Sequence, residues 1–129
     1  IGRLNIDGTI TATYCHSDGY LAHVGRTLYN HYRSSAKVDA LMDLGNISSL
    51  GANIGTKHDF KQRPSDQCHV YGRDRGDEGT EATTFADRNA LRASQTGWEY
   101  LYLYNPTTTE WSVFIGDAWM DLAGSLTGR

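Results

Sequence analysis

The chain has 129 residues, 39% of them hydrophobic, and its 12 basic and 15 acidic side chains give a formal net charge of −3. This length suits a single domain, and the charge balance argues against a protein that binds mainly duplex nucleic acid. The longest apolar run is far below the roughly 20 residues that cross a bilayer, and two cysteines are too few for a secreted disulfide scaffold. We therefore expect one domain over residues 1–129 in a reducing cytoplasm.

The N-terminal segment has the pattern of a β-hairpin. Apolar and polar residues alternate on both sides of Asp7-Gly8, a dipeptide that tolerates the positive φ angles of a tight primed turn. We predict a hairpin over Leu4–Tyr14. Its second strand would deliver Cys15 and His16 to the strand end.

Two short helices are predicted next. Apolar residues recur every four residues from Val24 to Tyr32, which indicates a helix. Ser34 or Ser35 can cap the free amides of a second helix, and Gly45 suits its C-terminal end. The short connection between these helices favours their packing as a pair.

The rest of the chain is predicted to return to strands. After a long polar connection, a strand is expected at Cys68–Tyr71, and the segment Phe85–Leu91 is ambiguous between a loop and a short helix. The clearest strand pair is Glu99–Phe114, because aromatic and aliphatic residues fill both arms around a turn. A short end strand or cap is expected at 118–122.

Strands, then helices, then strands again indicate an α+β fold. We expect one antiparallel β-sheet built from hairpins, those of Leu4–Tyr14 and Glu99–Phe114, with two short helices from Val24–Leu44 packed on one face. Alternation places the tyrosines of the last hairpin on one sheet face and the leucines on the other. We interpret the leucines as core residues and the tyrosines as an exposed surface for a partner or a second copy; the alternative is that helices cover the tyrosines. The tyrosines are Tyr100, Tyr102 and Tyr104.

The segment Tyr14–Tyr32 concentrates three histidines, four tyrosines, a cysteine and an aspartate. His16, Asp18 and His23 include the ligand types of a zinc site, but their spacing lacks the paired short separations of such sites. We therefore expect no metal and no cofactor.

A thiol nucleophile is the second chemistry that this segment suggests. Cys15 lies beside His16, and a neighbouring imidazolium lowers a thiol pKa. Catalytic partners usually come from distant segments, however, so we assign no catalytic residue and expect a packing thiol. A small metal- or cysteine-dependent hydrolase centred on Cys15, His16, Asp18 and His69 stays as the alternative.

We interpret the same segment as a turn and a helix start whose polar groups line a ligand or partner site. Arg73 and Arg75 are two residues apart, so on an extended chain they would point the same way and could bind a phosphate or carboxylate. A solvated, internally paired loop is the favoured interpretation of this segment, and the anion fork is the sharper alternative. The predicted ligand-binding residues are His16, Asp18, Tyr20, His23, Arg73 and Arg75.

Four phrases taken together, "YCHSDGYLAHVGRTLYNHY", "KVDALMDLGNISSLG", "YGRDRGDE" and "EYLYLY" followed by a tryptophan, resemble small proteins encoded by bacteriophages and prophages. Ser17 stands where that pattern has a tryptophan. The resemblance implies a phage-type accessory protein in the cytoplasm of a bacterial host, and it transfers no catalytic residue.

We expect a binding function rather than an enzyme. The partner would be a host macromolecule or a small anionic or nucleotide-like ligand, and a counter-defence role follows by analogy alone. A virion structural or assembly protein is a further alternative, for which the tyrosine face would be the contact surface.

Overall fold

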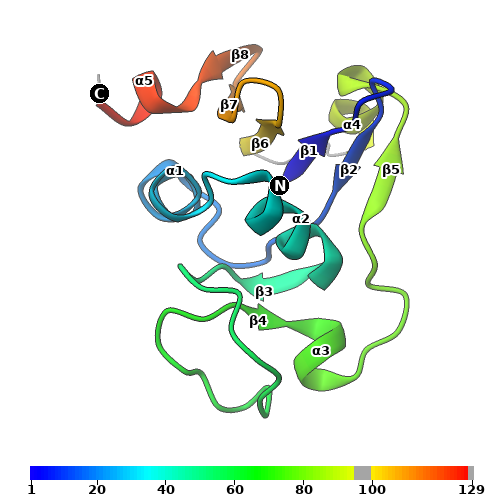
Figure 1. The fold of residues 1–129 in the computed structure, drawn as a ribbon, viewed down its shortest axis with the longest axis vertical. Coiled ribbons are helices and arrows are strands. Elements are labelled where there is room, and N and C mark those ends of the chain that lie inside the picture. The colour runs from blue at the N-terminus through cyan, green and yellow to red at the C-terminus, as the bar shows by residue number, and fades with distance from the viewer. Residues whose placement is uncertain (95–99, 128–129) are drawn as a thin grey trace.

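The fold is described by a computed structural model over residues 1–94 and 100–127 (Figure 1). The strands are β1 (Gly2–Leu4), β2 (Ile10–Ala12), β3 (Ile47–Ser49), β4 (His69–Val70), β5 (Thr83–Phe85), β6 (Tyr100–Asn105), β7 (Glu110–Ile115) and β8 (Ala118–Asp121). The helices are the π-helical turn η1 (Leu21–Gly25), α1 (Arg26–His31), α2 (Ser35–Leu44), α3 (Tyr71–Arg75), α4 (Arg88–Ser94) and α5 (Leu122–Thr127). The fold class is α+β, as predicted.

The described strands form two sheets. The larger has the order β5-β2-β1-β6-β7-β8, and β3 pairs with β4 in the smaller. Neighbouring strands are antiparallel except β1 and β6, which run parallel with Gly2 beside Leu103. This parallel pair joins the N-terminal hairpin to the C-terminal one. Figure 1 shows β3 and β4 far from β8 along the long axis, with α2 at intermediate height.

Both predicted hairpins are present. The C-terminal hairpin pairs β6 with β7 along their whole length; Glu99, where we expected it to begin, lies outside the described residues. The turn between β1 and β2 differs from the expected two-residue turn. The amide of Asn5 donates to the carbonyl of Thr9, and of the loop residues between them only Gly8 has a positive φ, +87°. This is a three-residue hairpin loop with one left-handed residue.

The predicted helix pair is also present. The hydroxyl of Ser34 accepts a hydrogen bond from the amide of Lys37 at 3.2 Å and so caps α2. Gly45 ends this helix with a φ of +75°, and a Cβ there would collide with the carbonyl of Thr80. The helix predicted from Val24 starts three residues earlier, as η1, and continues as α1.

Side chains cover the larger sheet on both faces. On the β6 face that carries Tyr102 and Tyr104, the core includes residues of η1, α1, α2 and α5. On the opposite face, Leu101 and Leu103 pack with Leu91 of α4. The predicted core role of the leucines is therefore confirmed, and α4 adds a helix on the second face.

The exposed tyrosine surface that we expected from the alternation is wrong for two of its three residues. The exposed fraction is 3% for Tyr102 and 0% for Tyr104, because helices cover this face of β6. Tyr100 is half-buried at the start of the strand. The outer face that alternation alone suggests is thus part of the main core.

The segment after Cys68 corrects a second expectation. The predicted strand is shorter, since β4 ends at Val70 and α3 begins at the next residue. The carboxylate of Asp74 accepts a hydrogen bond from the amide of Val70 at 2.8 Å, which holds this helical turn against the strand. Further along, Asp87 caps α4 by accepting from the amide of Ala90 at 2.8 Å, so the helical alternative for this segment is correct. The end strand is confirmed as β8, and α5 follows it.

Candidate functional site

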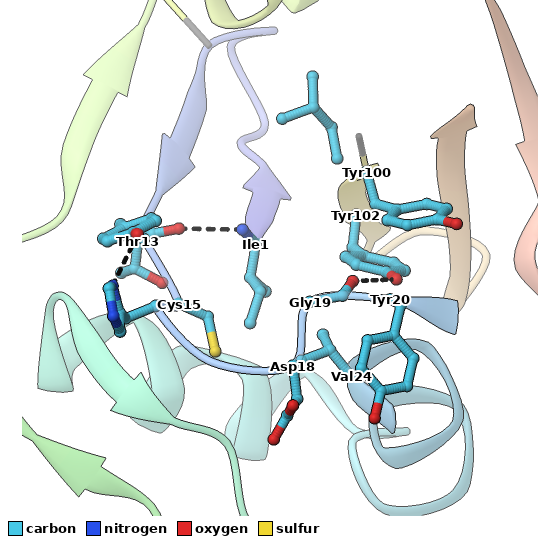
Figure 2. A pocket seen from close by; sticks show the side chains of 12 residues that line it. Ile1, Thr13, Cys15, Asp18, Gly19, Tyr20, Val24, Tyr100 and Tyr102 are labelled. Carbon is cyan, nitrogen blue, oxygen red and sulfur yellow. Dashed lines mark hydrogen bonds between the residues drawn. The ribbon is translucent and has the colours of Figure 1, made fainter. Parts of the chain in front are cut away.

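A pocket of about 400 Å³ lies where β2 ends and β6 begins. One wall consists of Thr13 and the residues that follow β2, and the other of Tyr20, Tyr100 and Tyr102. Figure 2 shows the side chain of Ile1 between the two walls. The volume is within the range of roughly 300–1,000 Å³ that is usual for small-molecule sites.

The tyrosine wall is built from one strand and one loop. The rings of Tyr100 and Tyr102 lie 6.3 Å apart between centroids and 21° from parallel, because alternate residues of β6 share a face. The hydroxyl of Tyr102 donates to the carbonyl of Gly19 at 2.7 Å, which fixes the loop to the sheet. Burial raises the pKa of Tyr102, so this phenol stays protonated. Tyr20 is 49% exposed and forms the rim.

The opposite wall is held by the smaller sheet. The amides of His16 and Ser17 donate to the carbonyls of Ile47 and Ser48 at 3.0 and 2.9 Å, so the chain after β2 runs alongside β3. The Nδ1 atom of His16 lies 3.0 Å from the hydroxyl of Tyr14, which orients the imidazole. The ring of His16 is exposed and lines the pocket.

Cys15 lines the pocket, but its environment does not favour a nucleophile. Burial raises the pKa of its thiol to about 11, so the thiol is protonated at neutral pH. Its Sγ donates to the carbonyl of Ser17 at 3.4 Å. The imidazole of His16 interacts with Tyr14 instead of the thiol, and this geometry matches the predicted packing thiol.

Asp18 and His23 differ in their relation to the pocket. Asp18 lines it with a left-handed backbone, φ +57°, and Figure 2 shows its carboxylate turned away from Tyr100 and Tyr102. In the described part of the chain this carboxylate accepts no hydrogen bond, whereas the backbone carbonyl of Asp18 accepts one from the amide of Val24. His23 lies behind Tyr20, with ring centroids 6.2 Å apart, and is not a lining residue.

The predicted anion fork of Arg73 and Arg75 is wrong, because the two residues lie on helix α3 rather than on an extended strand. Residues two apart on a helix point in different directions. Arg73 binds the carboxylate of Asp74 and the carbonyls of Ile54 and Cys68. Arg75 pairs with Asp77 at 2.7 Å. Neither arginine lines the pocket.

Thr13 is a polar lining residue that the sequence reasoning did not select. Its exposed fraction is 6%, and its hydroxyl has no hydrogen-bond partner among the described residues. A buried hydroxyl without a partner is unfavourable by about 1–3 kcal/mol. Thr13 directly follows the last residue of β2, and no local sequence pattern marks it.

The residues of the alternative hydrolase do not form one centre. Cys15, His16 and Asp18 line the pocket, whereas His69 contacts His58 at a separate place. Within residues 1–94 and 100–127, no group of three or more histidine, cysteine or acidic side chains is arranged to hold a metal ion. In the same part of the chain, no helix is long and apolar enough to cross a membrane.

Comparison of the chain with protein-family models, with curated proteins and with solved structures finds no match. The site must therefore be interpreted from its own geometry.

Proposed function

We propose that the protein binds a small planar ligand in the pocket between Thr13 and Tyr102. The observation that carries this proposal is the aromatic wall, with the stacked rings of Tyr100 and Tyr102 and the exposed ring of Tyr20 at the rim. Aromatic rings provide a stacking surface for planar heterocycles. The unpaired hydroxyl of Thr13 adds a polar group that a ligand can satisfy.

The proposed ligand is a neutral heterocycle of the nucleobase or nucleoside class. Among the described residues, no lysine or arginine lines the pocket, and its acidic lining residue is Asp18. A phosphate or carboxylate would find no lysine or arginine here to pair with. From the sequence we expected an anionic or nucleotide-like ligand. We now restrict that proposal to the uncharged part of such a molecule, its base or nucleoside.

Sequestration of such a ligand would fit a phage accessory protein in the cytoplasm of a bacterial host. The resemblance to phage and prophage proteins supports this role, and counter-defence by removal of a signalling molecule is the corresponding proposal. The cysteine hydrolase has less support because the thiol of Cys15 is protonated at neutral pH. The virion protein has less support because Tyr102 and Tyr104 are buried.

The test is a calorimetric titration with free nucleobases and nucleosides, followed by substitution of the rim. We expect Tyr20→Ala to weaken binding about tenfold or more, since base–aromatic stacking contributes roughly 1–3 kcal/mol per base. Tyr29→Ala is the matched control, because this half-buried tyrosine lies outside the pocket. Equal affinities for the two variants, or no binding of any heterocycle at millimolar concentration, would refute the proposal.

The hydroxyl of Thr13 gives a second measurement of the same site. Thr13→Val removes a buried, unpaired hydroxyl, so we expect the free protein to gain about 1 kcal/mol in stability while ligand affinity falls. Thr11→Val is the control on the same strand, since its hydroxyl accepts hydrogen bonds from Asn5 and Arg3. The control should lose stability and keep its affinity. A stabilised Thr13 variant with unchanged affinity would exclude this hydroxyl as a ligand contact.

A further inference from the structure

A second cluster of titratable side chains lies where the connection between β3 and β4 meets β4 and α3, and none of its residues lines the pocket. The Nε2 atom of His58 lies 2.9 Å from the Nδ1 atom of His69. Their rings meet edge to face, with centroids 5.0 Å apart and an interplanar angle of 85°. Both side chains are largely shielded, since the side chain of His58 is 10% exposed and His69 as a whole is 5% exposed.

Asp74 fixes the position of this pair. Its buried carboxylate accepts hydrogen bonds from the amides of His58 and Val70 at 3.1 and 2.8 Å and from the guanidinium of Arg73 at 2.9 and 3.1 Å. Burial alone would raise the pKa of Asp74, but these hydrogen bonds outweigh it and hold the pKa below its ordinary value. The carboxylate therefore stays ionised in mild acid, so protonation of Asp74 is not what releases the amide of His58.

The hydrogen bonds determine where the protons of the neutral pair lie. The Nδ1 atom of His58 lies 2.9 Å from the carbonyl of Thr56, which can only accept, so Nδ1 carries a hydrogen. The Nε2 atom of neutral His58 must then accept, and the Nδ1 atom of His69 must donate. In the described part of the chain, the Nε2 atom of His69 has no hydrogen-bond partner.

Only two of the three charge states of the pair keep this contact. A first added proton can reside on either ring, because one hydrogen still lies between the two facing nitrogens. A second added proton places a hydrogen on both of them, and the contact is lost.

The surrounding charges oppose the second proton. The positive charges of Arg63, Arg73 and a protonated His58 disfavour the charged form of His69. The negative charge of Asp74 favours it. Asp74 also faces the Nδ1 atom of His58 at 3.6 Å, and its oxygens are already shared with Arg73 and two amides. Burial, together with the charges of Arg63 and His58, lowers the pKa of His69. One carboxylate is therefore the counter-charge to two arginines and two imidazoles in this cluster.

We propose that the contact between His58 and His69 is an acid-sensitive latch that fastens the connection 53–67 to β4 and α3. The amides of Asn53 and Cys68 close the base of this connection through the carbonyls of Asp66 and Asn53 at 2.8 and 3.0 Å. The latch is one of several contacts that hold its middle, beside the stack of Phe60 on Tyr71 and the hydrogen bond from the amide of His58 to Asp74. Loss of the latch makes the segment around His58 open more readily, while the two sheets stay intact.

The direction of the pH effect follows from the lowered pKa. In the open form the imidazole of His69 titrates near the ordinary histidine pKa of about 6.5, whereas burial and nearby positive charge lower its pKa in the closed form. The equilibrium between the closed and open forms therefore favours the closed form fully above about pH 6.5. This preference decreases as the pH falls below that value. If the open form binds one more proton, the opening equilibrium rises by up to about tenfold per pH unit.

Hydrogen exchange between pH 7.5 and 5 tests the latch. After correction for intrinsic exchange rates, the amide of His58 should open up to about tenfold more per pH unit below about pH 6.5. The amides of Leu103 and Val113 in the larger sheet should keep their protection, which separates local opening from global unfolding. Unchanged opening of the His58 amide in acid would overturn the proposal.

His69→Asn isolates the role of titration. The asparagine amide can occupy the place of Nδ1, donating to neutral His58 and, after a flip, accepting from charged His58. This variant should remain closed at pH 5, whereas the control His31→Asn, at an exposed histidine, should open like the wild type. Should His69→Asn not fold, His58→Gln, whose amide can reach the place of Nε2, makes the same distinction. Acid-induced opening that persists in the folded variant would overturn the latch.

Discussion

At the scale of single residues, burial decides the chemistry of Cys15. Its sequence position beside His16 suggests an activated thiol, yet burial raises the pKa of the thiol to about 11 and His16 binds Tyr14 instead. The same contrast applies to Arg73, which resembles an anion ligand in the sequence and satisfies a buried carboxylate in the fold. The polar residues of a dense motif therefore need their partners before they can be assigned a role.

Cys15 gives a prediction for alkaline pH. Because the folded-state pKa of about 11 exceeds the ordinary value of 9.0, the thiol stabilises the fold below pH 9 and loses that contribution as the pH rises toward 11. Between pH 8 and 10.5 the wild type should lose about 2 kcal/mol more free energy of unfolding than Cys15→Ala. Urea unfolding at each pH measures this difference. Parallel curves for the two proteins would mean that the thiol does not titrate with a raised pKa.

At the scale of elements, local signals predicted helix α2 and both hairpins, and they failed at α3. The cap at Ser34 and the alternation in β6 are local, so the sequence displays them. The turn of the chain at Tyr71 depends on Asp74, whose carboxylate reaches back to Val70 and across to His58. A contact with a residue sixteen positions away leaves no periodic pattern.

The candidate site was also predicted only in part, because a sequence displays local groups of residues but not their long-range partners. Residues in one dense segment, His16, Asp18 and Tyr20, were selected together and line one pocket. Tyr100 and Tyr102 reach the same pocket through the long-range pairing of β1 with β6. Alternation along β6 could not show whether the tyrosine face of the strand is buried or exposed. Thr13 was missed because an unpaired hydroxyl is a property of the fold.

The cap of α2 provides a prediction at this scale. Ser34→Ala removes the hydrogen bond to the amide of Lys37, so we expect a loss of about 1 kcal/mol in the free energy of unfolding. Ser35→Ala is the control, because Ser35 lies within the first turn and does not make this bond. Chemical denaturation of both variants gives the comparison. Equal stabilities would show that the cap contributes nothing beyond helix propensity.

At the scale of the whole molecule, two hydrophobic clusters share the same strands. β6 contributes Tyr102 and Tyr104 to one cluster and Leu101 and Leu103 to the other, on opposite faces. Strand β7 does the same with Val113 and Phe114. Loss of either cluster would expose residues of the strands that also carry the other.

This sharing predicts a single cooperative unfolding transition. Trp111 lies in the larger cluster, and Trp119 packs against the smaller one. In variants that keep only one of these tryptophans, the others being replaced by phenylalanine, the midpoints of the two fluorescence curves should differ only by the stability change measured by circular dichroism. If, after this correction, one tryptophan reported unfolding earlier than the other, residues 1–129 would not behave as one cooperative domain.

The parallel pairing of β1 with β6 has a consequence for the order in which the protein can assemble. During synthesis, Gly2 is made long before Leu103, its neighbour in the finished sheet. Until β6 arrives, the hairpin of β1 and β2 presents an edge with unpaired amide and carbonyl groups, which is a template for association with other chains. Closing so large a loop also slows folding, because its entropy is lost before the contacts form. The nascent chain is therefore most vulnerable to aggregation in the interval between these two strands, which makes early occupation of that edge by a chaperone an advantage for yield.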